Sequence, residues 1–152
     1  MEAKIGIEQG HLQEVATTLN RILADEFLLY IKSRNAHWNV EGNDFYAKHK
    51  FFENQYEELD EIIDDVAERI RALGHFPIAS LKKFLKLTHL TENDSADFIK
   101  DLLNDHEQVI IELRRNINAI ATDLHDLGTS DFITGLMEKH EKMAWMLRAH
   151  LQ

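Results

Sequence analysis

The chain has 152 residues, which fits one domain with a hydrophobic core, and we expect a single domain over residues 1–152. It contains no cysteine, which excludes disulfides, thiolate metal sites and cysteine nucleophiles. The net charge of −10 disfavours nucleic acid and anionic membranes as partners and favours cations. No apolar run approaches the roughly 18 residues of a membrane span and no signal peptide is recognised, so we expect a cytoplasmic protein without membrane partners.

Two long helices are predicted in the first half of the chain, because apolar residues recur there every three or four positions. The first runs from near Glu8 to near Asn35, and the second from about Asp44 to Leu73. A glycine followed by a proline at residues 74–77 ends the second helix. Because only a short loop separates them, the two helices are expected to lie antiparallel.

The second half of the chain predicts a short helix over residues 78–87 and then two more long helices. The third long helix starts in the cap-rich segment 91–95 and reaches about Asp126. Residues 128–130, Gly-Thr-Ser, are expected to end it and to cap the fourth, whose apolar pattern continues to Leu147. The predicted fold is therefore all-α: a four-helix bundle with a short extra helix in the crossover between helices 2 and 3.

One face of the second predicted helix carries four side chains that can bind metal. At 100° per residue, His49, Glu53, Asp64 and Glu68 fall within about 100° of one another. They form two pairs, each one turn long, and the eleven residues from Glu53 to Asp64 span about 16 Å. One ion with bonds near 2 Å cannot be held by both pairs of the same helix.

A second copy of this helix, antiparallel across a two-fold axis near residues 58 and 59, resolves the problem. It places His49 opposite the other copy's Glu68, and Glu53 opposite the other copy's Asp64. The spacing thus predicts two identical sites across a symmetric dimer interface. The alternative is an ordinary solvated acidic face. Imidazole and carboxylate ligands without thiolate suit Fe(II), Zn(II) or Mn(II), so ligand type alone leaves the metal open.

A specific pattern runs through the first loop and the second predicted helix. Its residues are His37-Trp38-Asn39, Gly42, Phe45, His49, Phe52-Glu53, Tyr56, Asp64 and Ala67-Glu68-Arg69-Ile70. This pattern closely resembles the signature of the Dps proteins, the mini-ferritins named for DNA binding in starved cells. The resemblance implies a ferritin-like bundle that assembles from two-fold dimers into a hollow dodecamer. It also implies a ferroxidase that oxidises Fe(II), preferentially with hydrogen peroxide, stores ferric iron and protects against oxidative stress.

The resemblance also implies which residues hold the iron. His37, His49 and Glu53 would come from one subunit, and Asp64 and Glu68 from its neighbour, with up to two iron ions at each shared site. This division agrees with the antiparallel geometry obtained from spacing.

Two further roles follow from the resemblance. Trp38, beside a ligand, would donate an electron locally; the alternative is a plain interface aromatic. Asp123, Asp126 and Asp131 surround the turn between the third and fourth long helices, where the family has acid-lined three-fold pores for cations. The alternative for these aspartates is helix capping.

DNA compaction with little ferroxidase activity is the alternative function. The basic residues that could serve it are few: Lys4 near the N-terminus and the cluster Lys82, Lys83 and Lys86. Twelve chains of charge −10 would carry roughly −120, so we expect weak or no DNA binding near neutral pH.

Seven histidines lie outside the pattern and are expected to be surface or packing residues: His11, His75, His89, His106, His125, His140 and His150. Residues 8–11 form the only Glu-x-x-His in the chain. Because a bundle that holds two irons within one subunit needs this motif on two helices, ordinary ferritin chemistry is disfavoured.

Overall fold

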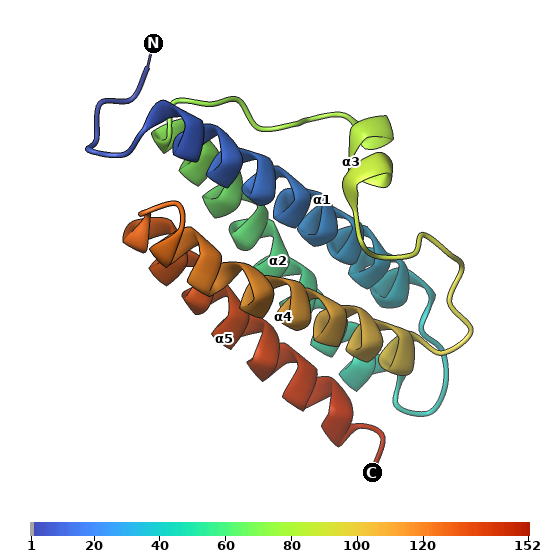
Figure 1. Cartoon of the computed structure of the whole chain (residues 1–152). Helices are drawn as coiled ribbons and strands as arrows, with labels where there is room; N and C mark the ends of the chain where they lie inside the picture. The colour runs from blue at the N-terminus through green and yellow to red at the C-terminus, as the bar shows by residue number, and fades with distance from the viewer. Residues whose placement is uncertain (1) are drawn as a thin grey trace.

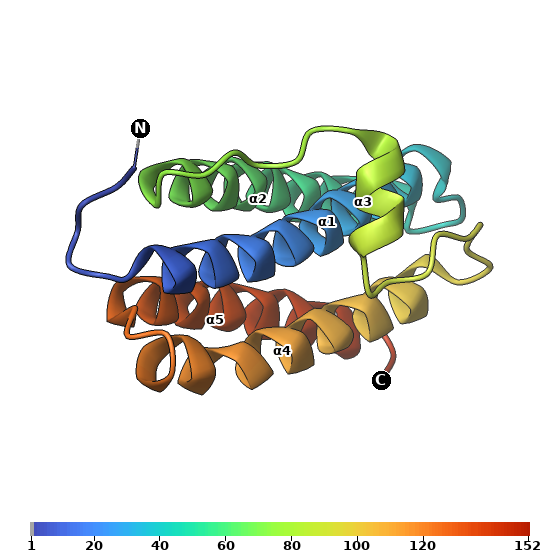
Figure 2. The same ribbon diagram turned by 45° about the horizontal axis from the view of Figure 1, so that its top comes forward.

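The computed structural model describes residues 2–152, and that part of the chain contains five helices and no strand. The helices are α1 (Gln9–Asn39), α2 (Phe45–Ala72), α3 (Leu81–Leu87), α4 (Phe98–Thr122) and α5 (Leu127–Ala149). The four long helices form a bundle, and the short α3 lies across the outside of α1 (Figures 1 and 2). The predicted all-α bundle with an extra helix in its crossover is confirmed.

The bundle consists of two antiparallel pairs, α1 with α2 and α4 with α5, which bury their apolar stripes against one another (Figure 2). The core includes Leu19 of α1, Phe52 and Leu59 of α2, Leu113 of α4 and Ile133 of α5, all fully buried. Burial of such side chains stabilises by roughly 1.5–3 kcal/mol each. No helix within residues 2–152 is sufficiently long and apolar to cross a membrane.

Helix α1 extends four residues beyond its predicted end near Asn35. The side-chain amide of Asn39 donates to the carbonyl oxygen of Asn35 at 3.1 Å, and the Val40 N–H donates to the Ala36 carbonyl at 3.0 Å. These bonds satisfy carbonyls that a helix end would otherwise leave unpaired. As a result, His37 lies in the last turn of a helix rather than in a loop.

The crossover is anchored to α1 by several contacts. The Ile78 N–H donates to the side chain of Asn20 at 2.8 Å, and residues 75–80 lie outside any helix, so α3 begins three residues later than predicted. The Phe84 ring stacks on Phe27 with ring centroids 4.5 Å apart. These contacts hold α3 against α1.

The corner between α4 and α5 differs most from the prediction. At its other end, helix α4 begins after the cap Asp97 rather than within residues 91–95. At the corner, α4 ends before His125, where a φ of +57° in the left-handed region turns the chain. Asp126 then caps α5. Gly128 is not a helix stop but lies in the first turn of α5, where a Cβ atom would approach Arg69 to 3.0 Å. A larger residue at this position would therefore require the Arg69 guanidinium to shift.

Three titratable side chains form a hydrogen-bonded chain inside the bundle. His140 Nε2 donates to Glu26 Oε1 at 2.9 Å, and the Nδ1 atoms of His140 and His106 are joined by a hydrogen bond of 2.9 Å. All three residues are fully buried, and neither Glu26 Oε2 nor His106 Nε2 has a partner. These two histidines are core residues, as the packing alternative predicted.

We expect this buried chain to make the protein less stable in acid. Burial lowers the pKa of His106 well below its usual value, and the nearby His140 acts in the same direction. Below about pH 6.5, His106 binds a proton in the unfolded chain but stays unprotonated in the folded chain. The free energy of unfolding therefore falls as pH falls. His106→Asn keeps a partner near the Nδ1 position but cannot titrate. Between pH 7 and 5, the unfolding temperature should fall less steeply with pH for this variant than for the wild type. The control His150→Gln, at an exposed histidine, should behave like the wild type. The same pH dependence in His106→Asn and the wild type would contradict the prediction.

Candidate metal centre

Two histidines meet where α1 ends and α2 begins. Gly42, with a φ of +118°, allows the tight connection between the two helices. This connection places His37, in the last turn of α1, against His49, in the second turn of α2. Their rings stack with centroids 3.8 Å apart and planes inclined by 21°.

The hydrogen bonds of this pair leave the same ring nitrogen free on both residues. His37 Nδ1 donates to the His49 carbonyl oxygen at 2.8 Å, and His49 Nδ1 donates to the His37 carbonyl oxygen at 2.8 Å. A backbone carbonyl can only accept, so both Nδ1 atoms carry protons, and in the neutral form of each ring Nε2 has a lone pair. This is the arrangement in which a second-shell carbonyl orients a metal-binding imidazole.

Glu53 lies one turn after His49, and its surroundings favour the ionised carboxylate. Lys50 forms an ion pair with its carboxylate. The hydrogen bond from Lys50 lowers the pKa of Glu53 below its usual value, and the charges of the two nearby histidines act in the same direction. A carboxylate that is ionised at neutral pH needs no proton release before it binds a cation.

Asp64 and Glu68 lie further along α2 and are exposed to solvent. Within residues 2–152 of one chain, no group of three or more histidine, aspartate or glutamate side chains is arranged to hold a metal ion. One chain therefore presents two candidate half-sites: a pair of imidazoles with a nearby carboxylate, and a separate pair of exposed carboxylates. The imidazole and carboxylate donors suit Fe(II).

Known proteins are similar to this chain in sequence. The model of the ferritin-like domain matches residues 16–152. A DNA protection during starvation protein of Bacillus anthracis is 36% identical over 91% of this chain and 97% of its own length. A low temperature-induced protein of Nostoc is 42% identical over 97% of this chain and 86% of its own length.

A solved structure agrees over the whole fold. The Dps protein of Vibrio cholerae, described as a ferritin-like diiron-carboxylate protein, superposes with a TM-score of 0.92 at 32% identity, over 99% of this chain and 97% of that one. The chain belongs to the Dps family.

Aromatic residues surround the histidine pair of this Dps chain. Trp38 is 66% exposed, and the Arg34 guanidinium lies 5.9 Å from its ring centroid. The same guanidinium lies 4.0 Å from the Tyr56 ring centroid and accordingly stacks on it more closely. Tyr56 contacts His37 edge-on, with ring centroids 5.2 Å apart. Exposure of Trp38 is compatible with both of its predicted roles.

No role for Arg34 was predicted from the sequence. However, Arg34 lies one helical turn before Trp38, and side chains at this spacing can contact each other on a helix surface. The guanidinium stacks on Tyr56, and the Tyr56 ring contacts His37, so Arg34 is linked to the histidine pair through one aromatic ring.

The three aspartates predicted for a pore separate into two kinds. Asp123 and Asp131 are exposed. Asp126 is buried: its carboxylate accepts from the Thr129 N–H at 2.9 Å and faces Arg69 at 3.4 Å. Asp126 therefore takes the capping role that the sequence left open, and its carboxylate is occupied within its own subunit.

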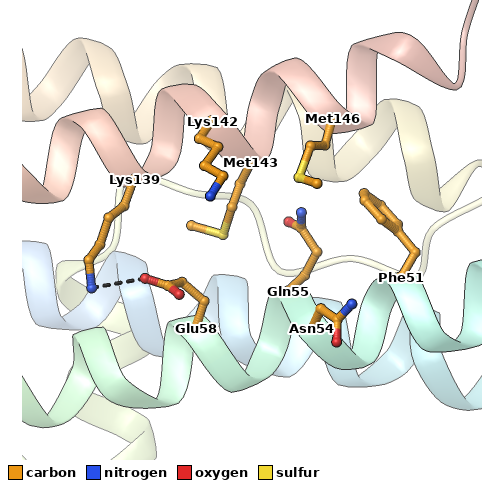
Figure 3. Close-up of a pocket in the computed structure, with 8 residues that line it drawn as sticks. All are labelled: Phe51, Asn54, Gln55, Glu58, Lys139, Lys142, Met143 and Met146. Atoms are coloured by element: carbon orange, nitrogen blue, oxygen red, sulfur yellow. Dashed lines mark ion pairs between the residues drawn. The ribbon is translucent and has the colours of Figure 1, made fainter.

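A groove between α2 and α5 lies apart from the metal ligands (Figure 3). Its volume is about 380 Å³, and it is crossed by an ion pair of 2.9 Å between Lys139 and Glu58. The side chains that line it are Phe51, Asn54, Gln55, Glu58, Lys139, Lys142, Met143 and Met146. None of them belongs to the predicted ligand set, so the groove is not part of the candidate metal centre.

Proposed function

We propose that this chain oxidises Fe(II) with hydrogen peroxide at sites shared between two subunits and stores the ferric product in a hollow dodecamer. The observation that carries this proposal is the histidine pair with both Nε2 atoms free. His37, His49 and Glu53 of one subunit would bind the substrate iron together with Asp64 and Glu68 of a second. Family membership supports the assembly, and the separate half-sites of one chain explain why it would be required.

The protein's own residues would bind and orient the iron rather than react with it. Two Fe(II) ions supply the two electrons that hydrogen peroxide requires, and with two protons the products are two Fe(III) ions and two water molecules. No hydroxyl radical is released when both electrons arrive at one site. The net charge of −10 would draw Fe²⁺ to the shell, and the exposed Asp123 and Asp131 are the remaining candidates for lining an acidic pore.

Anaerobic loading of the apoprotein with Fe(II), followed by stoichiometric peroxide, tests the proposal. Ferric absorbance should rise rapidly in the wild type and no faster than in buffer for His37→Ala or Asp64→Ala. Asp65→Ala is the matched control, because Asp65 is equally exposed but is not in the ligand set. If the wild type were no faster than buffer, the ligand face would be structural or would hold another metal.

DNA binding is the second candidate function, and three lysines on α3 are its only specific support. Lys82, Lys83 and Lys86 are exposed. A B. anthracis relative is named for DNA protection during starvation, but its name does not specify direct binding.

We expect no gel shift of duplex DNA at physiological salt, because the shell's negative charge opposes phosphate. The same assay at low salt, with the three α3 lysines changed to Gln, identifies any contribution from α3. A tight complex at physiological salt that the triple variant abolishes would overturn this expectation and favour DNA compaction.

A further inference from the structure

A second pair of histidines lies at the opposite end of α1 from the candidate iron centre. His11 is in the first turns of α1, and His125 is in the turn between α4 and α5. Figure 1 shows the start of α1 and this turn at the same end of the bundle. The two ring centroids are 5.5 Å apart and the ring planes are inclined by 58°.

This separation fits two imidazoles bound to one metal ion. With a metal–nitrogen bond of about 2.0–2.1 Å and a tetrahedral angle, the centroids of two ligating rings lie about 5.3 Å apart. The 5.5 Å between His11 and His125 is close to that value. By contrast, the core histidines His106 and His140 are joined directly by a hydrogen bond of 2.9 Å, which leaves no room for an ion between those nitrogens.

A nitrogen of this pair lacks a partner. Nδ1 of His11 is buried and makes no hydrogen bond, although the His11 side chain as a whole is half-buried. A buried polar atom left unpaired costs about 1–3 kcal/mol. A cation bound by this nitrogen would satisfy it.

The backbone at His125 also points to a role for its side chain. Its φ of +57° lies in the left-handed region, where glycine is the usual residue after a helix end. A non-glycine residue there costs on the order of 1 kcal/mol. The turn itself would be served better by glycine, so the imidazole is not explained by the helix end.

We propose that His11 and His125 form a second metal site, which binds a divalent cation that prefers imidazole, such as Zn²⁺. No set of three protein ligands is arranged around an ion within residues 2–152, so water completes the coordination. Exposed carboxylates nearby in the chain, Glu8 and Asp123, add favourable negative potential. The site uses no ligand of the proposed iron centre and is independent of peroxide chemistry.

Equilibrium dialysis of the assembled apoprotein against Zn²⁺ tests this proposal, together with a crystal soaked in Zn²⁺ and measured at the zinc absorption edge. We expect an anomalous peak between the two rings. We also expect one class of Zn²⁺ site per subunit to weaken about tenfold or more in His11→Gln and in His125→Gly. His37→Ala should weaken a different class.

His125→Gly separates binding from folding. Because glycine relieves the positive φ, this variant should unfold at the same temperature as the wild type or higher, yet lose the site. His75→Gln is the matched control, because His75 borders a separate surface pocket with Gln9 and Gln13 at the same end of the molecule. Unchanged Zn²⁺ binding in His125→Gly, or no peak between the rings, would overturn the proposal.

Discussion

Shells that contain both His37→Ala and Asp64→Ala subunits are expected to recover about a quarter of the wild-type peroxide-dependent Fe(II) oxidation, although shells of either variant alone lose it. In a mixed dimer, one site combines both defects. The other combines the intact histidines of the Asp64→Ala subunit with the intact carboxylates of the His37→Ala subunit. Random pairing makes half of the dimers mixed, with one working site of two in each.

The matched control is a mixture of His37→Ala and His49→Ala subunits. Both defects then lie in the histidine half-site, so no pairing restores a complete site. Ferric absorbance after stoichiometric peroxide measures both mixtures, which must be co-expressed so that dimers form at random. Equal activity in the two mixtures would show that the site is not shared in the proposed way.

Glu26→Ala is expected to destabilise the subunit more than removal of any surface charge. Glu26 accepts from His140 Nε2 at 2.9 Å, and both side chains are fully buried. Removal of the Glu26 carboxylate leaves His140 Nε2 buried without a hydrogen-bond partner and opens a cavity. The expected cost is about 3–5 kcal/mol, which corresponds to a fall in melting temperature of roughly 10 °C for a chain of this size.

The matched control for Glu26 is Glu58→Ala. Glu58 also forms an ion pair between two helices, with Lys139 of α5, but both side chains are about 40% exposed. Solvent screening limits such a pair to about 1 kcal/mol or less. Thermal unfolding at one protein concentration compares the two variants, because assembly makes the midpoint depend on concentration. Equal shifts in melting temperature for the two variants would show that the buried Glu26–His140 hydrogen bond adds little to the free energy of unfolding.

Much of the fold and of the candidate site could be predicted from helical periodicity. The period of 3.6 residues placed His49, Glu53, Asp64 and Glu68 on one face of α2, and their axial spacing indicated that one chain cannot gather them. Within residues 2–152 of one chain, no three of these side chains are arranged to hold a metal ion. Its histidine pair adds that both Nε2 atoms are free, which depends on carbonyl positions that spacing does not specify.

Helix ends were predicted less well, because they depend on contacts with other helices. Glycine is a typical helix-stop residue, yet Gly128 lies within α5, where a Cβ atom would approach the Arg69 guanidinium of α2 to 3.0 Å. The chain instead turns at His125, which is not a typical turn residue. Asp126 caps the next helix and is therefore buried rather than available to a pore.

By itself, the sequence determined the four-helix bundle, the family and the candidate metal-binding face, because each follows from the order of residues along one helix or from a continuous pattern. Tertiary structure alone decided which polar side chains meet. Glu26, His106 and His140 each fall within the apolar stripe of their own helix, so their burial could be foreseen from periodicity. Their hydrogen bonds to one another could not be foreseen from periodicity, because the rotation and axial offset of α1, α4 and α5 are set by packing among the helices.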